Sequence, residues 1–521
     1  MQKKSIGLIS ATFLGVSSII GSGWLFAPYS CAVVVGPGSI FCWIVGAIVI
    51  SLLAMCFAEV AVLYPKRGLS AIIPTISHNK FFGFPFAIAN WLGIIAIVAL
   101  EAVATVQYLT WLVPSAQHYF YHHNQLTLLG NCLSILLVCC YCLVNYWGTK
   151  VLTKTNNPLS LLKITIPIIT ALVIIGVAFH PQNFISMGSS TMMPYGYKSV
   201  FIAILTTGII ISFNGFQTVI SFSSEINNPK KTIPLSMLLA IALCAGIYLL
   251  LQISFIGGLP SELLANGWKS LEFSAPMVQL ALLIGVGALA PLIYFGATIA
   301  PSSAAIAFTG SATNMSTAMA NNQQLPRYFG IINPIYGVSR HALLLNTGLA
   351  IVFLFLFKSW GEIAQVLSLF HLISYLPIPI ALCVFRDVVR HEKYSFFLPW
   401  GRVIAALLFV FFTYLFTMAS LKTATDLMLM LAVFQIIFIV PQVKSVGDFF
   451  SAIKQCYWLL IYFITLLGFV WLSPNNNHLL NESLFNTLVI SFGVIFFFVL
   501  SKTETGDVAI MDAAVNIYKR D

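Results

Sequence analysis

Two ionisable side chains, Lys163 and Glu101, lie inside long apolar stretches of this 521-residue chain. If these stretches cross a membrane, each charge costs at least about 2.5–3.5 kcal/mol, so such residues are usually functional or paired. Glu101 is the only charged residue between Phe81 and Pro114. It could carry a proton, pair with Lys163, contact a cationic substrate, or form a neutral hydrogen bond to a neighbouring helix. Lys163 could instead extend its ammonium to the membrane surface, about 7.5 Å along a helix from Pro158.

Two polar segments that contain glycine interrupt the apolar pattern. Residues 17–26 read S-S-I-I-G-S-G-W-L-F, and residues 208–217 read G-I-I-I-S-F-N-G-F-Q. Irregular backbone at membrane depth is tolerated only where it is buried in protein or lines a cavity. Paired interruptions in two halves of a chain indicate the binding site of a transporter. The alternative is close helix packing through small residues.

The composition indicates what must position these residues. The chain is 59% apolar and 8% charged, with a mean hydropathy of +0.95, whereas soluble domains carry about 25% charged residues. This excludes a soluble enzyme, a disordered protein and a secreted disulfide scaffold. A spanning helix needs about 20 apolar residues, and we count about fourteen such segments between residues 7 and 501. The sequence therefore predicts an all-α polytopic membrane protein.

The basic residues predict the orientation of these spans. With the N-terminus inside, twenty of the 25 Lys and Arg residues fall in cytoplasmic segments and Lys163 falls within a span. Cytoplasmic loops carry such an excess, so we expect a cell (inner) membrane protein with both termini in the cytoplasm. The net charge of +10 then reflects membrane topology, and we expect no nucleic-acid partner. The outer segments hold the remaining four: Lys198, Lys269, Lys358 and Lys422.

The two interruptions fall in the first predicted span (residues 7–31) and the sixth (residues 199–223). Each therefore opens a group of five spans, and an odd number inserts the second group upside down. We expect a five-plus-five inverted repeat. The predicted parts are residues 1–180 (first repeat), 198–386 (second repeat), 400–501 (four additional helices) and 502–521 (a cytoplasmic tail).

Several motifs carry a resemblance to a known family. They are Gly21-Ser22-Gly23, the two residues Ala58-Glu59 followed by Tyr64-Pro65-Lys66, N-P-K-K-T-I-P at residues 228–234, and L-P-R-Y-F-G at residues 325–330. Together they resemble the amino acid-polyamine-organocation permeases, which share the LeuT-like fold, over residues 1 to about 385. The G-S-G-W-L-F variant is similar to that of bacterial permeases that include aspartate/proton symporters.

The resemblance implies that the two interruptions bind an amino acid. The N–H groups of Ser22 and Gly23 would receive the substrate carboxylate at a helix start. Backbone carbonyls near Ile19, Ile211 and Asn214 would receive its ammonium. Aromatic and amide side chains of the same segments would select the substrate side chain, unless the rings simply pack. The expected substrate-binding residues are Ile19, Gly21, Ser22, Gly23, Trp24, Ile211, Ser212, Phe213, Asn214 and Gly215.

The resemblance also implies how transport is driven. Proton-coupled members carry a lysine at the place of Lys163, where sodium-coupled relatives bind a cation, so Lys163 is the first expected proton-coupling residue and Glu101 the second. Many relatives have a glutamate at the position that Gln217 occupies here. Glutamine does not titrate, so pH sensing at this position is in doubt. We expect Glu59 to close the inner end of its span. The proton is the expected coupling ion, without a cofactor or a metal ion.

We therefore expect a secondary amino acid transporter that works by alternating access as an amino acid/proton symporter. The alternatives are an amino acid exchanger of the same fold and a nutrient sensor that binds without transport. No Walker loop indicates drive by ATP, and no Ser-His-Asp set or H-E-x-x-H motif indicates an enzyme. No span supplies an obvious arginine for a side-chain carboxylate, so small neutral substrates are as plausible as acidic ones. The sequence does not predict an oligomeric state.

Overall fold

The computed structural model describes residues 6–63, 69–112, 117–122, 125–147, 150–185, 192–221, 226–388, 396–474, 476 and 479–502. All of the predicted tail except Lys502 lies outside these residues, as do Tyr64-Pro65-Lys66. The regular secondary structure of the described residues is helical apart from an isolated bridge between Ile6 and Ile226 and one short hairpin, in which β1 (Tyr121–His122) pairs antiparallel with β2 (Gln125–Leu126). An all-helical fold is what the apolar composition predicts, since a helix pairs its own backbone groups within the membrane.

The described residues up to Val177 form eight α-helices. They are α1 (Leu8–Ile19), α2 (Gly23–Val35), α3 (Ser39–Leu63), α4 (Leu69–Ser77), α5 (Lys80–Leu109), α6 (Gln117–Phe120), α7 (Leu128–Tyr146) and α8 (Lys150–Val177). Helix α5 lies at the centre, with nearly all its side chains buried, and packs against α14, α16 and α4.

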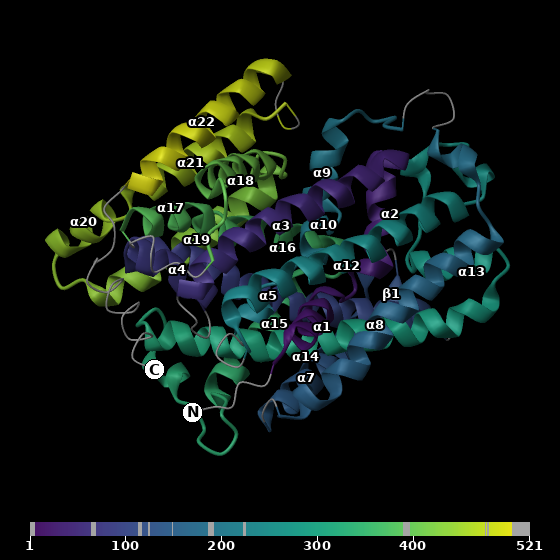
Figure 1. The fold of residues 1–521 in the computed structure, drawn as a ribbon, viewed down its shortest axis with the longest axis horizontal. Helices are drawn as coiled ribbons and strands as arrows, with labels where there is room; N and C mark the ends of the chain where they lie inside the picture. Colours follow the sequence, from purple (N-terminus) through teal and green to yellow (C-terminus); the bar gives the residue numbers. More distant parts are fainter. Residues whose placement is uncertain are drawn as a thin grey trace.

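The described residues from Lys198 to Val388 form nine α-helices. They are α9 (Lys198–Thr206), α10 (Ile209–Ser212), α11 (Thr218–Ser221), α12 (Pro229–Gly258), α13 (Pro276–Leu283), α14 (Ala290–Asn321), α15 (Arg340–Leu356), α16 (Trp360–Tyr375) and α17 (Pro377–Val388). Helix α1 packs against α12, α8 and α14 (Figure 1), so the start of the chain is enclosed by elements that follow it by more than a hundred residues.

The last described helices lie on one side of the bundle (Figure 1). Helix α22 packs against α18, α17 and α21, while α19 packs against α5. Helices α20 and α21 are separated by a bend of 66°. Their bounds are α18 (Gly401–Phe416), α19 (Leu421–Ile439), α20 (Val446–Lys454), α21 (Tyr457–Leu472) and α22 (Glu482–Lys502).

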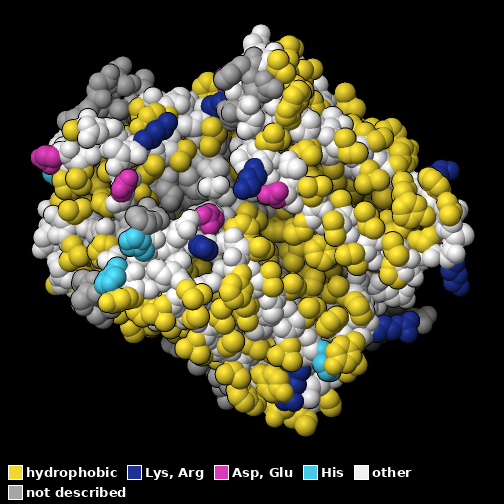
Figure 2. Space-filling model, turned by 180° about the vertical axis from the view of Figure 1, so that it is seen from behind, with side chains coloured by type: hydrophobic (Ala, Val, Ile, Leu, Met, Phe, Trp, Pro, Cys, Tyr) yellow, Lys and Arg dark blue, Asp and Glu magenta, His cyan; other side chains and the backbone are white. Residues whose placement is uncertain are grey.

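Within the described residues, nine helical segments are long and apolar enough to cross a membrane, or ten with the bent pair α20–α21. Helices α1, α15 and α18 are apolar but shorter, and α9, α10 and α11 are shorter still. The predicted number of fourteen crossings stays a prediction, because broken helices do not reach spanning length individually. Apolar side chains cover broad areas on the right and lower parts of the face in Figure 2, while charged side chains lie in its left and upper centre and at its edges. Broad apolar areas are what a lipid-facing surface requires.

Candidate functional site

The first interruption separates α1 from α2. Helix α1 ends at Ile19, Ile20 is extended with φ −78° and ψ 96°, and α2 begins at Gly23. A helix end leaves carbonyls without partners and a helix start leaves N–H groups without partners. Within the described chain, the N–H groups of Gly23 and Trp24 donate to no acceptor. The interruption therefore presents opposite backbone charges a few residues apart, as predicted from Gly21-Ser22-Gly23.

Glu101, from the middle of α5, lies at the start of α2. The Ser22 N–H donates to both of its carboxylate oxygens, at 3.1 Å to Oε1 and 2.8 Å to Oε2. A negative charge is stabilised there by the positive end of the α2 dipole. A Cβ on Gly21 would collide with Glu101 Oε1, so only glycine at position 21 lets this carboxylate approach. Glu101 thus occupies the position where the sequence predicts the substrate carboxylate.

Lys163, from α8, lies at the other side of the same interruption. Its Nζ donates to the Ser17 carbonyl oxygen at 2.7 Å, and the residue is 2% exposed. The ammonium therefore meets the negative end of the α1 dipole and does not extend to the membrane surface. Among the described residues no ion pair joins Lys163 to Glu101. The two predicted proton-coupling residues instead form hydrogen bonds on opposite sides of the α1–α2 break.

The second interruption comprises two breaks. Gly208, with φ +87°, separates α9 from α10, and residues 213–217 separate α10 from α11. Gly215 has φ +111°, and a Cβ there would lie 2.6 Å from the Ser18 carbonyl carbon. Both facts require glycine at this position, because an L side chain is strained at such a φ and the backbone of α1 fills the space. The two interruptions, far apart in sequence, are thus in direct contact.

Tyr248, from α12, joins the ends of both broken helices. Its hydroxyl lies 3.3 Å from the Ile19 carbonyl oxygen and 2.9 Å from that of Ser212. These carbonyls belong to the two helix ends that the sequence predicts will receive the substrate ammonium. In the structure, the Tyr248 hydroxyl is a hydrogen-bond donor near both carbonyls, and a buried carbonyl needs a donor. Sequence reasoning missed Tyr248, since one tyrosine in an apolar helix has no local signature.

The predicted selectivity residues Trp24 and Phe213 are fully buried on different sides of the site. The Trp24 ring lies against Gly296 of α14. The Phe213 ring packs edge-on against Trp43 and Tyr248, with centroids 5.9 and 5.6 Å apart. The structure therefore does not bring these two rings together, and their role in selecting a substrate stays a prediction.

Asn214 lies in the second interruption, between α10 and α11, and is 2% exposed. Its Nδ2 donates to the Tyr375 hydroxyl at 3.0 Å, and Gln217 Nε2 donates to Asn214 Oδ1 at 3.4 Å. The amide is thus held by two polar partners, one on α16. Tyr375 was also missed from the sequence, because its partner is known only once α16 packs beside the break.

Trp360, at the start of α16, covers the first interruption. Its Nε1–H donates to Ser22 Oγ at 2.9 Å, and its ring stacks on Phe26 with centroids 4.8 Å apart. Phe26 in turn packs edge-on against Tyr108 at 5.2 Å. Three aromatic rings from α2, α5 and α16 therefore close one side of the site. No motif around Trp360 indicates this contact in the sequence.

An ion pair lies near the C-terminal end of α3. Arg386 donates to Glu59 through Nε (2.7 Å to Oε1) and Nη2 (2.6 Å to Oε2), and the Leu398 N–H donates to Oε2 at 2.7 Å. Both charged side chains are buried. Glu59 thus joins α3 to α17 and to the segment before α18, consistent with its predicted closing role.

Comparisons with known proteins identify the family. The amino acid permease family model matches residues 6–439. The chain is 32% identical over 476 residues to the glutamate/serine transporter AimA of Bacillus subtilis, covering 91% of this chain and 88% of the relative. It is 28% identical to the aspartate-proton symporter of the same organism, covering 90% of each.

A solved structure of the Eremococcus coleocola manganese transporter has a TM-score of 0.55 at 13% identity, covering 88% of this chain and 95% of that one. At this identity the likeness concerns the fold alone. The sequence similarity extends across both interruptions and their partners. The chain is thus a multi-pass membrane transporter and belongs to the amino acid permease family of the amino acid-polyamine-organocation superfamily.

Proposed function

We propose that this protein is a symporter that moves an amino acid together with a proton into the cytoplasm by alternating access. The observation that carries the proposal is the placement of Lys163 and Glu101 at opposite ends of the α1–α2 break. Each is a buried ionisable group bonded to the backbone that would bind the substrate. A change in the proton content of either group therefore changes the site itself.

Lys163 supports the coupling through α1. Its ammonium makes a charge-assisted hydrogen bond to the Ser17 carbonyl at 2.7 Å, and such bonds are about twice as strong as neutral ones. Loss of the proton from Nζ would remove the charge that meets the end of α1. Helix α1 would then be free to move relative to α8, and this movement would open or close the substrate path between these two helices.

Glu101 supports the coupling through competition. A substrate carboxylate that binds the Ser22 N–H must displace the Glu101 carboxylate, which holds it at 2.8 Å. Two carboxylates cannot share this position without repulsion unless one is protonated. Protonation of Glu101 therefore favours substrate binding, and the substrate enters with a proton. Tyr248 is displaced in parallel when the substrate ammonium reaches the carbonyls of Ile19 and Ser212.

The substrate class follows from the relatives and the site chemistry. The two relatives are named for glutamate, serine and aspartate, and the residues at the breaks supply hydroxyls, amides and free backbone groups. We propose serine, aspartate and glutamate as the first substrates to test. The proposed architecture is the five-plus-five inverted repeat with four further helices, fourteen crossings in total, in the cell membrane with both termini in the cytoplasm.

Uptake of radiolabelled amino acid into proteoliposomes tests the proposal. A symporter accumulates substrate when an inward proton gradient is imposed on vesicles without internal substrate. An exchanger takes up label only when the vesicles hold unlabelled amino acid. A nutrient sensor shows a substrate-induced thermal shift without uptake under either condition. Accumulation that requires internal substrate and ignores the gradient would therefore favour the exchanger over the proposed symporter.

A further inference from the structure

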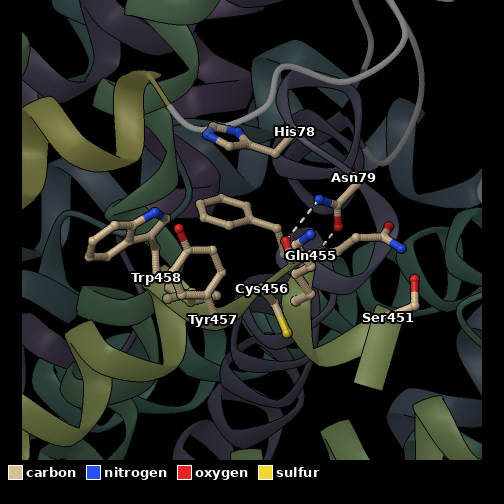
Figure 3. A pocket seen from close by; sticks show the side chains of 10 residues that line it. His78, Asn79, Ser451, Gln455, Cys456, Tyr457 and Trp458 are labelled. Atoms are coloured by element: carbon tan, nitrogen blue, oxygen red, sulfur yellow. Dashed lines mark hydrogen bonds between the residues drawn. The ribbon is translucent and has the colours of Figure 1, made fainter. Parts of the chain in front are cut away.

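A cavity of about 470 Å³ lies away from the α1–α2 break, at the bend between α20 and α21. It is closed on the other side by the turn before α5 (Figure 3). The Asn79 side chain holds the two sides together: its Nδ2 donates to the Gln455 carbonyl at 3.1 Å, while its Oδ1 accepts from the N–H of Phe82 at 2.9 Å. The lining residues are His78, Asn79, Phe82, Ser451, Lys454, Gln455, Cys456, Tyr457, Trp458 and Leu459.

The lining has the chemistry of an anion site. Among the described residues that line it, Lys454 is the one charged residue and none is Asp or Glu, and they offer hydroxyl, amide and indole donors. Asp448, the acidic residue of α20, accepts from the N–H groups of Lys444 and Ser445 at the far end of that helix. The positive end of the α21 dipole also lies at the rim, because α21 begins at Tyr457 without a side-chain cap.

A second, apolar cavity of about 210 Å³ adjoins the first, and Cys456 and Leu459 line both. It runs between α5, α19 and α21 and is lined by apolar side chains apart from Gln435, whose amide donates to the Phe81 carbonyl at 3.0 Å. A polar, basic space thus lies next to a hydrocarbon-lined one, with Cys456 and Leu459 in the wall of both. This is the profile of a lipid, with a charged headgroup and an acyl chain.

Helix α20 places these cavities at the level of the headgroups. It bends by 66° from α21, and its Val446 and Phe450 side chains are 75% and 65% exposed. A short helix with exposed apolar groups and flanking lysines lies at the boundary between headgroups and acyl chains. Tyr457 and Trp458 beside the cavity are typical of that boundary.

We propose that these cavities form a binding site for one anionic phospholipid, with its phosphate in the Lys454 cavity and one acyl chain in the α5–α19–α21 groove. In the orientation predicted from the basic residues, the site faces the cytoplasmic leaflet, which is rich in anionic lipids. The lipid joins α5, which carries Glu101, to the last helices of the chain. It therefore stabilises the core of the transporter against α19–α21.

Lipid binding to the purified, delipidated full-length protein tests the proposal, by native mass spectrometry and thermal unfolding. Dioleoyl phosphatidylglycerol should be retained and should raise the unfolding temperature more than dioleoyl phosphatidylcholine does. Inorganic phosphate and glycerol 3-phosphate at equal concentration should give no shift, because they lack the acyl chain. A shift with phosphate equal to that with the lipid would overturn the lipid assignment in favour of a soluble anion.

Two variants and two controls locate the site. Lys454→Ala should weaken phosphatidylglycerol binding about fivefold, whereas Lys444→Ala, outside the lining on the same connection, should not. Ala432→Trp places an indole in the apolar cavity and should reduce retention, whereas Val433→Trp, on the neighbouring surface of α19, should not. Unchanged retention in both Lys454→Ala and Ala432→Trp, or equal binding of the two lipids to the wild type, would overturn the proposal.

Discussion

The backbone N–H of Ser22 donates to both carboxylate oxygens of Glu101, at 3.1 and 2.8 Å. A side chain from the centre of α5 thereby fills the helix start that would receive a substrate carboxylate. Tyr248 does the same for the carbonyls of Ile19 and Ser212. Side chains of the protein thus occupy part of the hydrogen-bonding capacity of both breaks, while the N–H groups of Gly23 and Trp24 stay without an acceptor in the described chain. A substrate bound at the breaks would replace the bonds to Glu101 and Tyr248 with its own.

The Glu101→Gln variant separates the hydrogen bond from the charge. The amide oxygen can still accept from the Ser22 N–H, but it cannot titrate. We expect proton-gradient-driven accumulation to fall to the level measured without a gradient, while exchange of internal for external substrate persists. Proteoliposome uptake and counterflow measure the two. Full accumulation in Glu101→Gln would exclude Glu101 as a proton carrier.

Gly21→Ala tests the close approach of α5 to the break. Its added Cβ would collide with Glu101 Oε1, and such overpacking costs about 1–3 kcal/mol. Glu101→Ala should relieve the collision, so the two substitutions together should be less destabilising than their sum by about 1 kcal/mol or more. Thermal unfolding of the four proteins measures this. Gly246→Ala, whose Cβ meets open space, is the control, and simple additivity of Gly21→Ala with Glu101→Ala would refute the contact.

Glu59→Gln tests the ion pair that joins α3 to α17. Removing the Glu59 charge leaves the buried Arg386 guanidinium without a carboxylate, although it keeps its bond to the Leu398 carbonyl, and breaking such a pair costs about 3–5 kcal/mol. We expect a large fall in the unfolding temperature. The exposed pair Arg402–Asp387 is the matched control, since Asp387→Asn should cost at most about 1 kcal/mol. Equal effects of the two substitutions would mean that Glu59 does not hold the inner end closed.

His78 predicts how stability depends on pH. It lies between α4 and α5, with Nε2 2.8 Å from the Leu500 carbonyl oxygen. Burial lowers its pKa from the ordinary 6.5 to about 4. Between these values the unfolded chain binds a proton that the folded protein does not, so stability falls as the pH falls from 6.5 to 4, by about 3 kcal/mol at 1.36 kcal/mol per pH unit.

The His78→Gln variant removes this titration and keeps an amide donor for the Leu500 carbonyl. Its unfolding temperature should fall less than that of the wild type between pH 6.5 and 4, and the two profiles should run parallel above pH 7. Thermal unfolding across this range measures both. Identical profiles throughout would show that His78 does not contribute to acid instability.

The sequence predicted the parts of the site that depend on local chemistry. Glycine and serine in an apolar run weaken a helix, so the breaks at Gly21 and Gly215 were predictable, and a buried charge stands out in a span, as Lys163 does. The family assignment from the motifs is confirmed. The predicted repeat boundaries and the roles of the substrate-binding residues stay predictions.

The parts that depend on which helices pack together could not be predicted. Tyr248 and Trp360 act on the breaks only because α12 and α16 lie beside them, and neither residue differs locally from other aromatic residues in apolar helices. The same holds for Arg386 as the partner of Glu59. One sequence shows which residue types are costly in a membrane, but their partners follow from the tertiary contacts.

Proton-driven accumulation by Lys163→Ala tests the central claim most directly. The variant is reconstituted in proteoliposomes beside the wild type and Lys422→Ala, an exposed lysine far along the chain. If the Lys163 ammonium on the Ser17 carbonyl couples the proton to transport, Lys163→Ala loses gradient-driven accumulation of serine, aspartate or glutamate, while Lys422→Ala retains it. Full accumulation by Lys163→Ala under the same gradient would contradict the account.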